Sequence, residues 1–236
     1  MTEAENDAET ATDGELPASR GIVDRQSGLA EAASARKKMT AMAARAIGPK
    51  LDFDIPRMTM LSLLTRAQGF HDSAVAALQA DNPFATFTLL RSYAENAALL
   101  CWLVDKPADI ERIYPSAPAD RTIRVGQLTN YAEKRLGGFR PIYAQLSKFA
   151  HPGAGTALSG WHAGDENSVH WTSVPTFKND DDFKVGCFWV VELAEANSHL
   201  WSECWVAYFG PQPKYVPPAW VGPTTESKGG TEPEDS

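Results

Sequence analysis

The sequence has few cysteines and no long uninterrupted apolar segment. Its three cysteines, Cys101, Cys187 and Cys204, are an odd number without C-x-x-C spacing, which excludes a disulfide-stapled miniprotein. We therefore expect buried free thiols and a reducing, cytoplasmic location. Charged residues interrupt the most apolar segment, residues 84–104. It therefore predicts no membrane span, and no signal peptide is expected.

The sequence also lacks a basic excess, but its acidity is unevenly distributed. The net charge is −8, with seven acidic and two basic residues in 1–26 and four acidic and two basic residues in 211–236. Residues 27–210 keep 18 basic and 19 acidic residues and are close to neutral. The overall charge therefore does not exclude an anionic partner for this central part.

Composition divides the chain into three parts. Residues 1–26 contain too few large apolar side chains to offset chain entropy, so we predict a disordered acidic tail. Residues 211–236 are rich in proline, which disfavours helix, and predict a second, largely disordered tail. Residues 27–210 are predicted to form a single helical domain.

The central part predicts an all-α bundle of about six helices. The 83–104 helix is apolar nearly all round, so we expect it at the centre. Residues 152–180 hold four glycines and a run of β-forming residues, which predict a loop or short β-hairpin before the last helix. The predicted helices are 27–48, with Ser27 as N-cap, 56–80, 83–104, 120–136, 141–150 and 180–209.

Arg91 and Glu95 are charged residues on the apolar central helix. Their i, i+4 spacing predicts an ion pair, because an unpaired charge in such a helix would be costly. The pair has two interpretations. It fixes the register of the helix, or it lines a polar cleft in which Arg91 contacts an anion.

Tyr143, Ser147 and His151 follow one another at four-residue spacing and drift slowly around one helical face. His151 stands at the predicted C-terminal end, where the helix dipole favours a protonated imidazole. This position suits a general acid, and it equally suits a simple helix cap.

A basic excess of +4 over residues 111–148 includes Arg121 and Arg135. It predicts either a phosphate-facing surface leading to His151 or a solvated helix face. Arg66 and His71 form an R-x4-H element of the kind found in HEPN-type ribonucleases, without the polar residue that usually follows the arginine. His71 also lies on an apolar stripe, which fits a hydrogen-bonded core histidine.

Two phrases of the sequence resemble elements of a loose group of uncharacterised bacterial helical proteins, some of which are similar to HEPN-like bundles. The phrases are Arg91-Ser-Tyr-Ala-Glu95 and Tyr143-Ala-Gln-Leu-Ser147-Lys-Phe-Ala-His151-Pro152. The resemblance covers roughly residues 56–153. It implies a bundle in which Arg91, Glu95, Tyr143, Ser147 and His151 converge on one interhelical cleft, and it implies no known reaction.

Three functions follow from these observations. The first is a HEPN-like module that binds RNA, a nucleotide or a protein partner, with Tyr143, Ser147, Arg121 and Arg135 as contacts. The second is a metal-independent endoribonuclease that uses His151, Arg91 and Glu95, or Arg66 and His71. The third is a non-catalytic dimeric scaffold whose interface is covered by Trp161, Trp171 and Trp220. The spacing of the histidines defines no metal geometry, so we expect neither a metal nor a cofactor.

Overall fold

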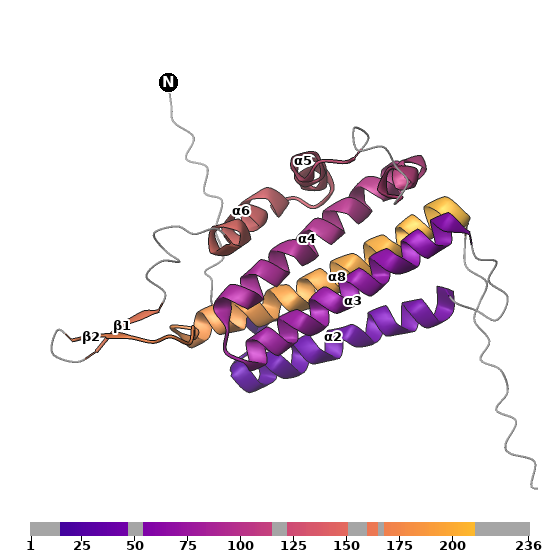
Figure 1. Ribbon diagram of the computed structural model, residues 1–236. Helices are drawn as coiled ribbons and strands as arrows, with labels where there is room; N and C mark the ends of the chain where they lie inside the picture. The colour runs from indigo at the N-terminus through magenta and orange to yellow at the C-terminus, as the bar shows by residue number, and fades with distance from the viewer. Residues whose placement is uncertain (1–14, 47–53, 115–121, 151–159, 165–167, 211–236) are drawn as a thin grey trace, which may run out of the picture.

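A computed structural model describes residues 15–46, 54–114, 122–150, 160–164 and 168–210 (Figure 1). These residues form an all-α bundle with one short β-hairpin, as the sequence predicts. Their elements are α1 (Glu15–Ser19), α2 (Arg25–Ala46), α3 (Ile55–Gln79), α4 (Pro83–Asp105), η1 (Pro107–Ile113), α5 (Val125–Arg135), α6 (Phe139–Ala150), β1 (Trp161–Ala163), β2 (Val169–Trp171) and α8 (Asp180–Phe209).

The core of the bundle lies between the four long helices α2, α3, α4 and α8, which run side by side in Figure 1. Asn96 of α4 contacts Asn197 of α8, and Thr86 lies beside Gly186 about three turns earlier on each helix. These pairs show that α4 and α8 run parallel to each other. The predicted central position of α4 is confirmed, because it packs against α3, α5, α6 and α8.

α2 approaches α8 closely where Gly28 faces Cys187. A Cβ atom at position 28 would lie 2.9 Å from Cys187 Sγ, so only glycine allows the two helices this separation. All three cysteines are free and buried, as predicted. Burial raises the pKa of each thiol to about 12.

Side-chain caps define the helix starts. Asn82 Oδ1 accepts a hydrogen bond from Ala85 N and so caps the N-terminus of α4. The predicted cap of α2 was wrong by one turn. Asp24 Oδ1 accepts from Ser27 N over 2.7 Å, while Ser27 Oγ accepts from Asp24 N over 3.0 Å. Asp24 is therefore the cap, and Ser27 completes a reciprocal capping box.

The prediction of a disordered tail over residues 1–26 was wrong for residues 15–26. They form α1 and the start of α2, and Ile22 is only 1% exposed in the core. Arg20 also contacts Glu192 and Glu195 on α8. One well-placed isoleucine and one ion-pair cluster anchor a segment whose composition is otherwise that of a tail. Residues 1–14 and 211–236 lie outside the described residues.

The two short helices α5 and α6 cover α4 on the side away from α2 (Figure 1). The predicted helix 120–136 begins later, at Val125. Ile123 is buried in extended chain, and Gln127 Oε1 accepts from Arg124 N to close the helix start. The predicted hairpin is confirmed as the antiparallel pair β1 and β2, which projects from the bundle near the start of α8 (Figure 1).

Candidate functional site

Arg91, Glu95 and Tyr143 meet between α4 and α6. Arg91 Nε donates to the Tyr143 hydroxyl oxygen over 3.2 Å, and this hydroxyl donates to Glu95 Oε1 over 2.7 Å. Arg91 Nε and Glu95 Oε1 are 3.4 Å apart. The predicted ion pair is confirmed, and so is the predicted convergence of Tyr143 on it. The side chains of the pair are 25% and 20% exposed, so the network sits at the edge of the core.

The electrostatics of this network favour a stable charge pair. The hydrogen bond to Tyr143 raises the pKa of Arg91. Burial, followed by the hydrogen bond to Glu95, raises the pKa of Tyr143. The guanidinium therefore stays charged and the phenol stays protonated near neutral pH. A network of this kind holds two helices together.

Ser147, which was also predicted to share this cleft, has a hydrogen-bond partner outside the network. Ser147 donates its hydroxyl hydrogen to the backbone oxygen of Tyr143, one turn earlier on α6, over 2.7 Å. His151, the predicted general acid or helix cap, lies outside the described residues, as does Arg121. The catalytic roles predicted for His151, Arg91 and Glu95 therefore stay predictions.

Arg135, a predicted RNA contact, lies in an ion-pair cluster at the other end of the bundle. It donates to Asp105 over 2.9 Å and to Glu203 over 2.6 Å. The side chain is 31% exposed. The two carboxylates would compete with a phosphate for its guanidinium, which therefore ties α5 to α4 and α8.

The prediction of Arg66 and His71 as an alternative catalytic pair was wrong. His71 is 1% exposed, with its ring edge-on to Tyr93, whereas Arg66 lies on the exposed face of α3 over the ring of Phe70. Five-residue spacing on a helix turns the two side chains well apart. A ribose hydroxyl cannot reach the imidazole through the core.

His71 also lacks the hydrogen bonds expected of a core histidine. Within the described residues neither ring nitrogen has a partner of good geometry, although the Ala32 backbone is close. Burial lowers the pKa of His71, and the nearby Asp72 carboxylate only partly opposes this effect. The ring is therefore neutral near pH 7.

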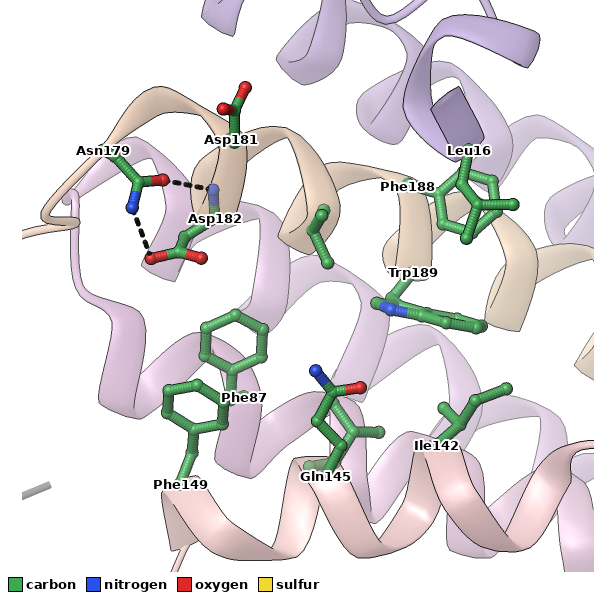
Figure 2. Close-up of a pocket in the computed structure, with 12 residues that line it drawn as sticks. Leu16, Phe87, Ile142, Gln145, Phe149, Asn179, Asp181, Asp182, Phe188 and Trp189 are labelled. Carbon is green, nitrogen blue, oxygen red and sulfur yellow. Dashed lines mark hydrogen bonds between the residues drawn. The ribbon is translucent and has the colours of Figure 1, made fainter. Parts of the chain in front are cut away.

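A pocket between α6 and the first half of α8 was missed at the level of sequence. Its volume is about 470 Å³, a size typical of ligand sites. Figure 2 shows Phe87 and Phe149 together at one end, with Gln145 and Ile142 of α6 opposite Trp189 of α8. The Phe87 and Phe149 rings stack with centroids 4.2 Å apart. The other lining residues are Leu16, Leu146, Asn179, Asp181, Asp182, Val185 and Phe188.

The rim of this pocket is acidic where α8 begins. Asn179 Oδ1 accepts from Asp182 N over 2.7 Å, and Asn179 Nδ2 donates to the Asp182 carboxylate over 3.0 Å (Figure 2). Asp181 is paired with Lys184 at 2.6 Å. Aromatic walls beside carboxylates suit a ligand with an apolar group and a neighbouring donor or positive charge.

A sequence signal for this pocket existed but was weak. Ile142, Leu146 and Phe149 recur at helical spacing, and α6 is the most amphipathic helix, yet such a stripe ordinarily predicts core. Only the tertiary arrangement leaves part of it uncovered. Leu16, which forms one wall, falls in the segment predicted to be disordered.

Comparison of the chain with models of known protein families, with curated proteins and with solved structures gave no match. The HEPN-like resemblance therefore stays a prediction. Across the described ranges, no helix is both long and apolar enough to cross a membrane. The same ranges hold no cluster of three side chains suited to binding a metal ion.

Proposed function

We propose that the protein is a cytoplasmic, non-catalytic interaction module that takes an aromatic side chain of a protein partner into the pocket between α6 and α8. One observation carries this proposal: an aromatic-lined cavity of about 470 Å³ has carboxylates at its rim. Buried aromatic anchors in such cavities dominate the energetics of many protein interfaces. The Asp182 carboxylate at this rim would accept from an indole or from a basic residue beside the anchor.

The charge of the rim separates the three classes of ligand predicted from the sequence. RNA and nucleotides bring phosphates, which the carboxylates of α8 repel. A protein segment with a basic residue is attracted by the same groups. The pairing of Arg135 with Asp105 and Glu203 also weighs against a phosphate-binding surface on α5. These charges favour a protein partner.

In this proposal the Arg91, Glu95 and Tyr143 network is a positioning element. It joins α4 to α6 less than about two turns from the stacked Phe87 and Phe149 rings. The network therefore holds α6 at the distance from α8 that leaves the pocket open. It makes no contact with the bound segment itself.

Short fluorescein-labelled peptides test the proposal. A peptide with a central Trp-Arg pair is expected to bind with micromolar Kd in fluorescence anisotropy, and replacement of Trp by Ala or of Arg by Glu should weaken binding at least tenfold. Gln145→Trp places a bulky ring at the pocket and should abolish binding. The matched control Ala144→Trp adds the same ring to the neighbouring exposed position on α6 and should leave Kd unchanged.

Two results would overturn the proposal. One is equal affinity for the Trp-Arg and Ala-Arg peptides, since only the anchor side chain differs between them. The other is unchanged Trp-Arg binding by the Gln145→Trp variant at unchanged thermal stability. A single-stranded RNA oligonucleotide measured in the same assay reports on the competing RNA interpretation, which requires an affinity that falls with salt.

A further inference from the structure

The β1–β2 hairpin carries an exposed apolar face. Trp161 lies directly opposite Trp171 in the antiparallel register. Directly opposed residues project to the same side, and Val169, two residues before Trp171, shares that side. Trp161 is 46% exposed, and Val169 and Trp171 are each 62% exposed.

The opposite face of the hairpin is polar. His170 and Ser168 contact each other there at 3.3 Å, and both belong to β2 or its flank. The hairpin is thus amphipathic, although the face that would normally be buried is exposed. Two strands alone are marginally stable in water, and exposed contiguous apolar surface marks an interaction site. We therefore expect the Trp161–Trp171 face to pack against another apolar surface.

The same chain contains a cavity that suits this face. The pocket between α6 and α8 is aromatic, and the Asp182 carboxylate at its rim can accept from an indole N–H group. Only residues 172–179 separate Trp171 from α8, whose first half lines the pocket. The hairpin projects from the end of the bundle at which α8 begins (Figure 1). No residue of the described hairpin lines the pocket of its own chain.

We infer that the partner is a second copy of this chain, whose Trp161–Trp171 face enters the pocket while its own pocket receives the first copy's hairpin. This inference rests on the proposed function of the pocket. Because one chain carries both surfaces at one end, reciprocal exchange closes a twofold dimer and leaves no surface open for further growth.

The area involved reaches the range of specific interfaces. An indole buries up to about 250 Å². At the observed exposures, four tryptophans and the pocket walls that they cover would bury on the order of 1,000 Å² in total, at the lower limit for a specific, reversible dimer. One hairpin in one pocket would bury half of this area, so the reciprocal arrangement is the stable one.

Sedimentation velocity of the full chain between about 1 and about 100 µM tests the inference. The unmodified protein is expected to form dimers with micromolar Kd. Trp161→Ala/Trp171→Ala should weaken dimerisation at least tenfold, and so should Gln145→Trp. Val206→Ala, an exposed apolar residue on the far half of α8, and Ala144→Trp are the matched controls and should leave Kd unchanged.

Mixing the two defective variants distinguishes hairpin-in-pocket exchange from other dimers. Each variant keeps the surface that the other lacks, so the two variants should form heterodimers more readily than either forms homodimers. Energy transfer between different labels on the two variants measures the heterodimer. A monomeric unmodified chain, or a dimer that survives both hairpin substitutions, would overturn the inference. So would a monomer whose peptide affinity rises after Trp161→Ala/Trp171→Ala, because the hairpin would then occupy its own pocket.

The peptide assay, run on the Trp161→Ala/Trp171→Ala variant, distinguishes failure of the inference from failure of the proposed function. If Trp-Arg peptides bind this variant in the pocket while the unmodified chain stays monomeric, only the second copy is excluded as partner. If the peptides fail to bind the Trp161→Ala/Trp171→Ala variant and this variant still dimerises, the pocket is excluded as the binding site and both proposals fall.

Discussion

Asn96 of α4 donates a side-chain N–H to the side-chain oxygen of Asn197 of α8 over 2.8 Å in the middle of the core. Asn197 donates in turn to the backbone oxygen of Leu193 over 2.8 Å. The two side chains are only 2% and 1% exposed. The hydrogen bond between these two buried amides can form in one register only, so it fixes how the two parallel helices align along their length.

Asn197→Leu should destabilise the fold, because Asn96 then keeps a buried amide without its partner. We expect a loss of about 1–3 kcal/mol in the free energy of unfolding, measured by urea denaturation. The double variant Asn96→Leu/Asn197→Leu removes both amides and should recover part of this loss. As a control, Ser202→Leu places the same side chain at an exposed position of α8 and should change stability by less than about 0.5 kcal/mol. This account would be contradicted if the double variant lost more free energy of unfolding than the two single substitutions lose when added together.

His71 should make the protein less stable in mild acid. Burial lowers the pKa of its imidazole in the folded state below the usual value of about 6.5, with Arg36 adding to this effect and Asp72 opposing it. The unfolded chain therefore binds the proton more readily than the folded one. The stability that the neutral ring contributes is complete above about pH 6.5 and is lost as pH falls toward the folded-state pKa.

Urea denaturation between pH 5 and 8 measures this effect. The free energy of unfolding should fall by up to about 1.4 kcal/mol per pH unit below pH 6.5 from this one group. His71→Leu should flatten that part of the profile. His199→Gln is the comparison variant, because it removes a histidine whose side chain is 75% exposed. An identical slope for the unmodified protein and His71→Leu would contradict the assignment.

Tyr143→Phe removes the hydroxyl that links Arg91 to Glu95 while keeping the ring. Because the charge pair remains at 3.4 Å, we expect a moderate loss of about 1–2 kcal/mol in thermal or urea unfolding. Ser147→Ala is the matched control on α6. Its hydroxyl only donates to the preceding turn of its own helix, so its loss should cost less than about 0.5 kcal/mol. Equal effects of the two substitutions would argue against a special role for the network.

Arg135→Gln distinguishes an ion-pair residue from a phosphate contact. The side chain is partly exposed and shared between Asp105 and Glu203, so its replacement should cost about 1 kcal/mol or less, and less still in high salt. Retention of a single-stranded RNA in a filter-binding assay should not change. A loss of RNA affinity at unchanged stability, together with a shallower salt dependence, would favour the RNA-binding interpretation.

Local chemistry made much of the fold predictable from the sequence. The start of α4 at Pro83 and the apolar stripe of α3 that carries His71 depend only on neighbouring residues, and both are found as predicted. The i, i+4 spacing likewise sufficed for the Arg91–Glu95 pair. What sequence reasoning could not supply was contact between distant segments.

Long-range contacts explain the incorrect predictions. Ile22 is ordered because it reaches a core built by helices far along the chain, which composition does not reveal. The pocket is lined by α6 and α8, which are about thirty residues apart in the sequence, together with Leu16 of α1. The R-x4-H spacing of Arg66 and His71 suggested a catalytic pair, but the packed core buries the histidine, which spacing alone does not reveal.

The parallel alignment of α4 and α8 has a consequence for how the chain is made. α8 completes the core, yet it follows α4 by about 75 residues and is synthesised last of the long helices. Until α8 is synthesised, the inner faces of α2, α3 and α4 lack the helix that covers them, and exposed apolar surface of this kind is prone to aggregation. Closure of the bundle is then a long-range event, which makes a slow final folding step a property of this topology.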